Sequence, residues 1–168
     1  MKTLYILRHA KSSWDDLDLA DFDRPLNPRG LLAAPFMGEL IATRGFVPSI
    51  ILCSPARRAR QTAELVKDQA ALDANIKFDE RIYEASPQGL RQVVSELHDS
   101  MEAAMVVGHN PGMEGFVRFL TGETETMPTA ALAVITLDID SWQVLNDGCG
   151  VLNSVYRPKE EAAKQKAQ

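Results

Sequence analysis

Cysteine and long apolar runs are both scarce in this sequence. Cys53 and Cys149 are the only cysteines among 168 residues, and neither lies in a Cys-x-x-Cys motif or a Cys/His cluster. This pattern excludes a disulfide framework and predicts no zinc or redox site. The apolar run at the start of the chain ends at Arg8, too soon for a signal-peptide core or a membrane span. We therefore expect a cytoplasmic protein without a membrane partner.

Positive charge is also in short supply. Lys and Arg number 18 against 23 Asp and Glu, which gives a formal net charge of -5. A broad face for the nucleic acid backbone is therefore not expected, although a local basic pocket can exist in an acidic protein. Nucleic acid is not an expected partner.

The chain is long enough to bury one compact core, because 45% of its 168 residues are hydrophobic. We predict a single domain over residues 1–158. Residues 159–168 contain no aromatic and no β-branched residue, and this tail is expected either to fray or to form a solvated helix.

Short apolar runs alternate with longer helical stretches along most of the chain. The predicted strands are 3–8, 49–53, 76–79 and 104–107, and the predicted helices are 31–44, 56–71, 87–100 and 111–120. This alternation predicts an α/β fold of three layers, αβα, in which a mostly parallel sheet lies between helices. Residues 131–137 and 142–145, separated by a turn-like stretch, predict an antiparallel pair at the sheet edge.

Two helix starts can be read from serine and proline. Ser54 is expected to cap helix 56–71, with Pro55 at its first position. Pro35 is expected to lie in the first turn of helix 31–44 or to kink that helix, which should stop at Gly45.

Three of the predicted strand-to-helix junctions carry groups suited to a phosphoryl dianion. Arg8 and His9 follow the first strand, Arg58 lies in the first turn after the second, and His109 follows the fourth. Ligands bind at this carboxyl edge in open α/β sheets. Arginine forks and a protonated His109 can stabilise charge on the phosphoryl oxygens. His9, next to Arg8, is the better candidate nucleophile, because a neutral ring nitrogen is available at neutral pH.

The segments that carry these residues are LYILRHAKSSW, CSPARRARQTAE and VVGHNPGMEGF. They resemble the Arg-His, Ser-Pro-x-x-Arg and second-histidine elements of the histidine phosphatase superfamily, whose fold is phosphoglycerate mutase-like. The stretch DRPLNPRG and the short length look most like the SixA branch, the phosphohistidine phosphatases. The resemblance implies that His9 is phosphorylated in an intermediate and that Arg8, Arg58 and His109 hold the phosphate.

The family pattern is incomplete at the general acid. Superfamily members that act on phosphate esters place a glutamate after the third strand, and the nearest match here is Glu84, with Glu80 behind it. Glu84 is either a proton donor to the leaving group or a surface carboxylate, and both interpretations stay open. Lys11 is either a contact at the rim of the phosphate pocket or an ordinary loop residue. Arg24 and Arg29 are expected to pair with Asp21 or Asp23.

Together these features predict a phosphatase that acts through a phosphohistidine intermediate on protein phosphohistidine. The alternative is a phosphomonoesterase of the same superfamily that acts on a small phosphorylated metabolite. A phosphate-binding module without catalysis is the third hypothesis. No metal and no other cofactor is expected, because Arg8, Arg58 and His109 supply the positive charge.

Overall fold

A single six-stranded sheet organises the protein. The computed structural model describes residues 1–168 and has the strand order β3-β2-β4-β1-β5-β6. The strands are β1 (Lys2–Arg8), β2 (Ile50–Cys53), β3 (Asn75–Phe78), β4 (Ala103–Gly108), β5 (Leu132–Leu137) and β6 (Gly150–Tyr156). The first four are parallel, whereas β5 is antiparallel to β1 and β6 is antiparallel to β5.

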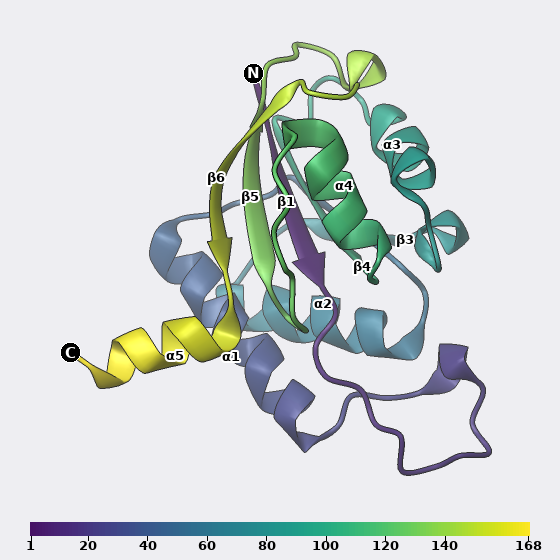
Figure 1. Ribbon diagram of the computed structural model, residues 1–168, viewed down its shortest axis with the longest axis vertical. Coiled ribbons are helices and arrows are strands. Elements are labelled where there is room, and N and C mark those ends of the chain that lie inside the picture. The colour runs from purple at the N-terminus through teal and green to yellow at the C-terminus, as the bar shows by residue number, and fades with distance from the viewer.

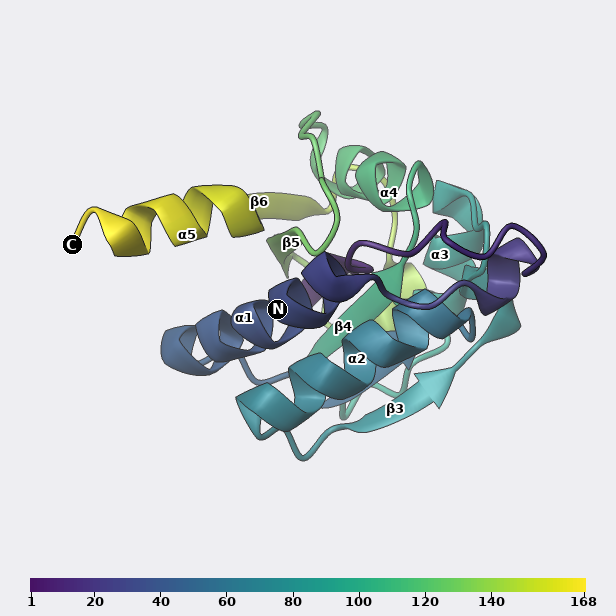
Figure 2. The ribbon, with the colours of Figure 1, turned by 90° about the horizontal axis from the view of Figure 1, so that it is seen from below.

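Helices cover both faces of this sheet (Figures 1 and 2). They are α1 (Pro28–Arg44), α2 (Arg57–Ala70), α3 (Pro87–Ser95), α4 (Gly112–Thr121) and α5 (Pro158–Lys166). The helices α1 and α2 pack on one face of the sheet, and α3 and α4 pack on the other, as the view in Figure 2 shows. The predicted three-layer αβα fold with a mostly parallel sheet and an antiparallel edge is confirmed.

Two apolar cores follow from the alternation of side chains along each strand. In β1, Leu4 and Ile6 point into a core of 21 buried residues shared with α3 and α4. Tyr5 and Leu7 point into a second core, of 20 buried residues, shared with α1 and α2. Because both faces of β1 are buried, its sequence reads as the continuous apolar run expected of a central parallel strand.

The first helix starts earlier than predicted. The Asn27 side chain caps α1 by accepting a hydrogen bond from the Gly30 N–H, and Pro28 takes the first helical position. Pro35 therefore lies inside the helix rather than in its first turn. The helix ends at Gly45, as expected, in the left-handed conformation with φ of 71°.

The predicted cap of α2 is wrong. The N-cap is Ala56, and Pro55 precedes the helix. The Ser54 hydroxyl accepts from the Ala56 N–H at 3.2 Å and also bonds to His109, so this serine belongs to the site described below. Helix α3 stops at Ser95, short of the predicted residue 100, and beyond it the chain turns at His98, whose Nδ1 accepts the Ser100 N–H.

The predicted edge strand is also wrong. Residues Trp142–Val144 form a 3-10 helix, and the strand that pairs with β5 is β6. Trp142 is fully buried; its indole N–H donates to the Met101 carbonyl at 2.7 Å and its backbone N–H donates to Asp99 Oδ1 at 3.1 Å. These bonds hold Trp142 against the core and leave its backbone unavailable for a strand ladder.

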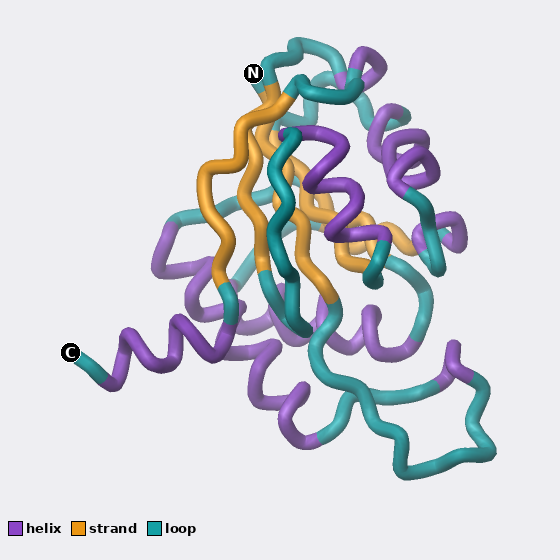
Figure 3. The backbone as a smooth tube through the Cα atoms, in the orientation of Figure 1, coloured by secondary structure: helices purple, strands orange, loops and turns teal.

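The C-terminal segment forms α5, which is the second of the two alternatives left open for it. This helix extends away from the body of the molecule (Figure 1). None of the helices is long and apolar enough to span a bilayer. At the same end of the sheet, the long loop that follows β1 reaches beyond the strand ends before the chain enters α1 (Figure 3).

Candidate active site

Two histidines lie side by side at the carboxyl edge of the central strands. Arg8 of β1 is in register with Gly108 of β4, so the residues that follow them, His9 and His109, emerge at the same level. The His9 N–H donates to the Gly108 carbonyl at 3.0 Å. The two imidazole centroids are 5.1 Å apart. The parallel pairing of β1 with β4 therefore brings together two residues that are 100 positions apart in the chain.

The His9 ring has one free nitrogen. Its Nδ1 lies 2.7 Å from the Ala10 carbonyl oxygen, and because a carbonyl only accepts, Nδ1 carries the proton. No hydrogen bond is made by Nε2, which keeps its lone pair. Burial, with smaller contributions from the positive charge nearby, lowers the pKa of His9 to about 3. The ring is therefore neutral at pH 7 and equipped for nucleophilic attack through Nε2.

His109 is held by the residue that follows β2. Its Nε2 and the Ser54 hydroxyl share a hydrogen bond of 2.8 Å. Burial and the neighbouring Arg58 lower the pKa of His109 to about 4. The expected protonation of His109 therefore concerns the site with a phosphoryl group bound, because in the free site burial beside arginine leaves the ring neutral at pH 7.

Two arginines bring permanent positive charge to the same edge. Arg58 is 6% exposed and donates from Nη1 to the Asp21 carbonyl at 2.7 Å and from Nη2 to Asp21 Oδ2 at 3.0 Å. Arg8 donates from Nη1 to the Met127 carbonyl at 3.1 Å. Burial lowers the pKa of Arg8 from its ordinary value. The predicted Arg24–Asp21 ion pair is present, with a separation of 3.1 Å, whereas Arg29 is exposed and pairs with neither Asp21 nor Asp23.

Three buried side-chain nitrogens in the protein have no hydrogen-bond partner: Arg8 Nε, Arg58 Nε and His109 Nδ1. Both arginine atoms are N–H groups, and His109 Nδ1 becomes one when the ring is protonated. An unpaired buried donor costs about 1–3 kcal/mol, so such groups are rare and cluster where a ligand completes them. All three belong to predicted site residues, which points to an anion with several acceptor oxygens.

A cavity of about 650 Å³ opens beside Arg58 and His109, whereas Arg8 and His9 are not among the residues that line it. Its walls are Asp21, Arg58, Glu84, Ala85, Ser86, Pro87, His109, Asn110, Pro111, Gly112 and Gly115. Glu84 is thus brought to the cavity, with an exposed side chain and a φ of 56°. Glu80 and Lys11 are not among the lining residues, and the Lys11 side chain is exposed.

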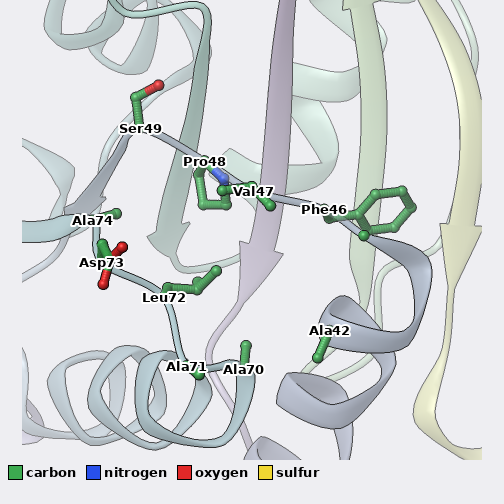
Figure 4. Close-up of a pocket in the computed structure, with 11 residues that line it drawn as sticks. Ala42, Phe46, Val47, Pro48, Ser49, Ala70, Ala71, Leu72, Asp73 and Ala74 are labelled. Carbon is green, nitrogen blue, oxygen red and sulfur yellow. The ribbon is translucent and has the colours of Figure 1, made fainter.

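A second cavity, of about 430 Å³, lies at the opposite edge of the sheet, where α1 and α2 end and β2 and β3 begin (Figure 4). It is lined mainly by apolar and small residues, and Asp73 is its one ionisable side chain. This cavity therefore lacks the groups that phosphoryl chemistry requires. Across the whole chain, no group of three or more His, Cys, Asp or Glu side chains is arranged to hold a metal ion.

The sequence did not predict three contributors to the site. The sequence predicts Ser54 only as a helix cap and assigns no role to Tyr83, whose hydroxyl donates to Asp21 Oδ2 at 2.7 Å. Asp21 was expected only as a partner of a nearby arginine, whereas it also binds Arg58. The sequence carries only a weak indication that Asp21 belongs to the site. It lies three residues before Arg24, and both residues precede the Pro-Leu of the DRPLNPRG stretch.

Acid is expected to destabilise the protein through the two site histidines. Their folded-state pKa values, about 3 and about 4, lie below the unfolded value of ~6.5, so the unfolded chain binds protons first as the pH falls. The free energy of unfolding should drop by on the order of 2–4 kcal/mol between about pH 7 and pH 5. Urea unfolding at each pH measures this change. His109→Gln should flatten the profile while His98→Gln, at an exposed histidine, should not; equal profiles for both variants would contradict the assignment.

Fold and site together define a class of protein. Two histidines, one of which has a free ring nitrogen, stand at the ligand-binding edge of an α/β sheet together with the buried Arg58 and the partly buried Arg8. This arrangement is that of phosphatases that use histidine rather than a metal-bound water.

Comparison with known proteins agrees with this class. The model of the histidine phosphatase superfamily (branch 1) matches residues 4–110. An uncharacterised protein of Mycobacterium tuberculosis is 31% identical over 166 residues, covering 91% of this chain and 100% of the relative. The chain belongs to the histidine phosphatase superfamily, and it is a phosphatase with the phosphoglycerate mutase-like fold.

Two solved structures resemble it over nearly their full length. A protein of Agrobacterium tumefaciens assigned as a SixA phosphohistidine phosphatase is 29% identical, with a TM-score of 0.80, covering 94% of this chain and 98% of that one. The protein histidine phosphatase SixA complexed with tungstate is 25% identical, with a TM-score of 0.82, covering 95% and 99%.

Proposed function

We propose that this protein removes the phosphoryl group from phosphohistidine on another protein, through a covalent phosphohistidine at its own His9. The observation that carries the proposal is the set of unpaired buried nitrogens, Arg8 Nε, Arg58 Nε and His109 Nδ1, gathered near the neutral His9 ring. The likeness to the two SixA structures supports the choice of phosphohistidine as substrate.

The reaction has two steps. In the first, the lone pair of His9 Nε2 forms a bond to phosphorus while the bond from phosphorus to the substrate imidazole breaks, and the leaving ring takes a proton from solvent. In the second, water adds to phosphorus, the bond to His9 breaks, and inorganic phosphate leaves. Arg8 and Arg58 place fixed N–H donors where charge accumulates on the three equatorial oxygens.

His109 has a different part in this proposal. It is neutral in the free site because burial and Arg58 lower its pKa to about 4. A bound phosphoryl dianion raises that pKa, because opposite charge favours the protonated ring. Nδ1, which has no protein partner, then donates to a phosphoryl oxygen, so that substrate binding at pH 7 takes up a proton.

Acid-quench labelling tests the proposal. The protein is mixed with a ³²P-phosphohistidine peptide or with a ³²P-phosphoester, quenched, and digested to locate the label. We expect an acid-labile, alkali-stable adduct on His9 that turns over to free phosphate, faster from the phosphohistidine peptide. Stoichiometric binding of the peptide without adduct or release would instead indicate a phosphate-binding module.

A small-molecule phosphomonoesterase is the second candidate, and Glu84 is the observation that favours it. This carboxylate lines the cavity, where its acid form can donate a proton to an alkoxide leaving group. An imidazole leaving group needs such a proton less. Glu84→Gln should slow ester hydrolysis by about 10²-fold while phosphohistidine hydrolysis stays within about threefold. Comparable losses for both substrates would place Glu84 in a role other than acid catalysis.

Chelation should leave the activity unchanged. Arg8, Arg58 and the proton taken up by His109 provide the positive charge that Mg²⁺ provides in other phosphoryl-transfer enzymes. Rates of phosphate release are measured before and after dialysis against excess EDTA. A loss that is restored by added Mg²⁺ or Mn²⁺ would contradict this part of the mechanism.

A further inference from the structure

The loop between β1 and α1 reaches the phosphate-binding arginine through one residue. Asp21 begins the 3-10 helix Asp21–Asp23 and contacts Arg58, which lies 37 residues further along the chain on α2. Two different acceptors of Asp21 are used: its backbone carbonyl bonds to Nη1 and its carboxylate bonds to Nη2. Asp21 therefore occupies the end of the guanidinium that carries both terminal nitrogens.

This contact determines which edge of Arg58 remains free. The guanidinium has five N–H groups in a rigid plane, and with both terminal nitrogens bonded to Asp21, the plane is fixed. The Nε–H has no partner and lies on another edge. Asp21 thus aims the unused edge of Arg58, since a long arginine side chain without such a contact has several rotamers to choose from.

Asp21 is itself held from two sides. Arg24 donates to Oδ1 from Nε at 3.2 Å and from Nη2 at 3.1 Å. Tyr83, on the segment that leads to α3, donates its hydroxyl to Oδ2 at 2.7 Å. Burial opposes ionisation, but the hydrogen bonds from Tyr83 and Arg58 lower the pKa of Asp21 to about 2.

Arg24 provides a rigid base for this arrangement. It is 6% exposed, donates from Nη1 to Ser12 Oγ at 2.7 Å, and lies with its guanidinium carbon 3.5 Å from the centroid of the Trp14 ring. The Tyr83 ring in turn packs edge-on against Phe22 and against His109, with centroid distances of 5.2 Å and 5.5 Å. Asp21 is therefore fixed by Arg24 and by Tyr83, each of which is itself packed against an aromatic ring.

We propose that Asp21 is a positioning residue for phosphoryl transfer, which holds the Arg58 guanidinium so that its free edge faces the phosphoryl oxygens, and that Tyr83 supports it. The inference rests on the proposed function and adds to it a residue that touches neither the nucleophile nor the reacting phosphorus. It explains why a carboxylate is present in a pocket for an anion: its charge is matched by Arg24 and Arg58.

Substitution of Asp21 tests the inference by phosphate affinity as well as by turnover. In Asp21→Ala, the affinity for inorganic phosphate and kcat/KM for a phosphohistidine peptide should fall by about 10- to 100-fold, because a misplaced binding group can cost that much. Asp21→Asn keeps an acceptor oxygen and should recover most of this loss. Asp23→Ala is the matched control, since Asp23 is exposed on the same 3-10 helix and makes no side-chain hydrogen bond or ion pair.

The outcomes separate the inference from the proposed function. Phosphate affinity of Asp21→Ala within about twofold of wild type, or an equal loss in Asp23→Ala, would overturn the inference even if the enzyme turns over. A wild type that binds phosphate but hydrolyses neither substrate would remove the proposed function and leave the affinity comparison valid. If Asp21→Ala does not fold, Tyr83→Phe replaces it: loss of one hydroxyl should weaken phosphate binding about three- to tenfold, and an unchanged affinity counts against the proposal.

Discussion

His9→Ala is expected to lower kcat for phosphohistidine hydrolysis by about 10⁴-fold or more and to abolish the labelled intermediate. The other candidate groups in the site are engaged elsewhere, because His109 Nδ1 donates its proton to a phosphoryl oxygen once substrate is bound. The Nε2 of His109 is occupied by Ser54, and burial raises the pKa of the Cys53 thiol, which therefore stays protonated and unreactive. Single-turnover kinetics with a ³²P-phosphohistidine peptide measures the loss.

The affinity for phosphate should survive this change. Arg8 and Arg58 keep their positions because their protein contacts, Met127 and Asp21, do not involve His9. The dissociation constant for inorganic phosphate is therefore expected to stay within about threefold of wild type. His98→Ala, at an exposed histidine, serves as the control and should retain full activity. A His9→Ala protein that still forms an acid-labile adduct would show that another residue is the nucleophile.

The positions of Arg8, His9, Arg58 and His109 at one sheet edge could be predicted from the sequence. Each of these residues ends or follows a short apolar run. Such a run is a strand buried on both faces, so its last residue marks the edge of the core. The carboxyl ends of parallel strands share an edge of the sheet, so parallel strands place all four residues at the same edge. The order of the strands was not available from the sequence, and it is the pairing of β1 with β4 that makes the two histidines neighbours.

Contacts between distant loops could not be predicted in this way. Asp21 and Tyr83 are 62 residues apart, and neither lies in a periodic segment that fixes its direction. The ionisation of His109 in the free site could not be predicted for a similar reason: a pKa depends on depth of burial and on neighbours in space, which a strand-end position does not reveal. Trp142 was mistaken for a strand residue because an aromatic, β-branched run is typical of strands, whereas its burial against Met101 is a tertiary contact.

Arg58→Ala is expected to lower kcat/KM by about 10³-fold, the scale seen when a fixed donor to a charged transition state is removed. Arg58→Lys should recover little of the loss. A lysine ammonium is a point charge that cannot bond to both Asp21 acceptors while presenting a second edge to the phosphate. Arg57→Ala is the matched control, because Arg57 is exposed in the same helical turn. Near-complete rescue by lysine would show that charge alone, without the planar fork, is what the site requires.

The same variant examines the link between Asp21 and Arg58. If Asp21 acts through Arg58, removing Asp21 from a protein that already lacks Arg58 should cost little more, so Asp21→Ala combined with Arg58→Ala should be within about threefold of Arg58→Ala alone. If Asp21 acts independently, the fold-loss in activity of the double variant should equal the product of the fold-losses of the two single variants. Coupling is expected here because the guanidinium has no other protein hydrogen bond: both of its bonds are to Asp21. The double variant therefore distinguishes a residue that aims the arginine from one that only stabilises the loop.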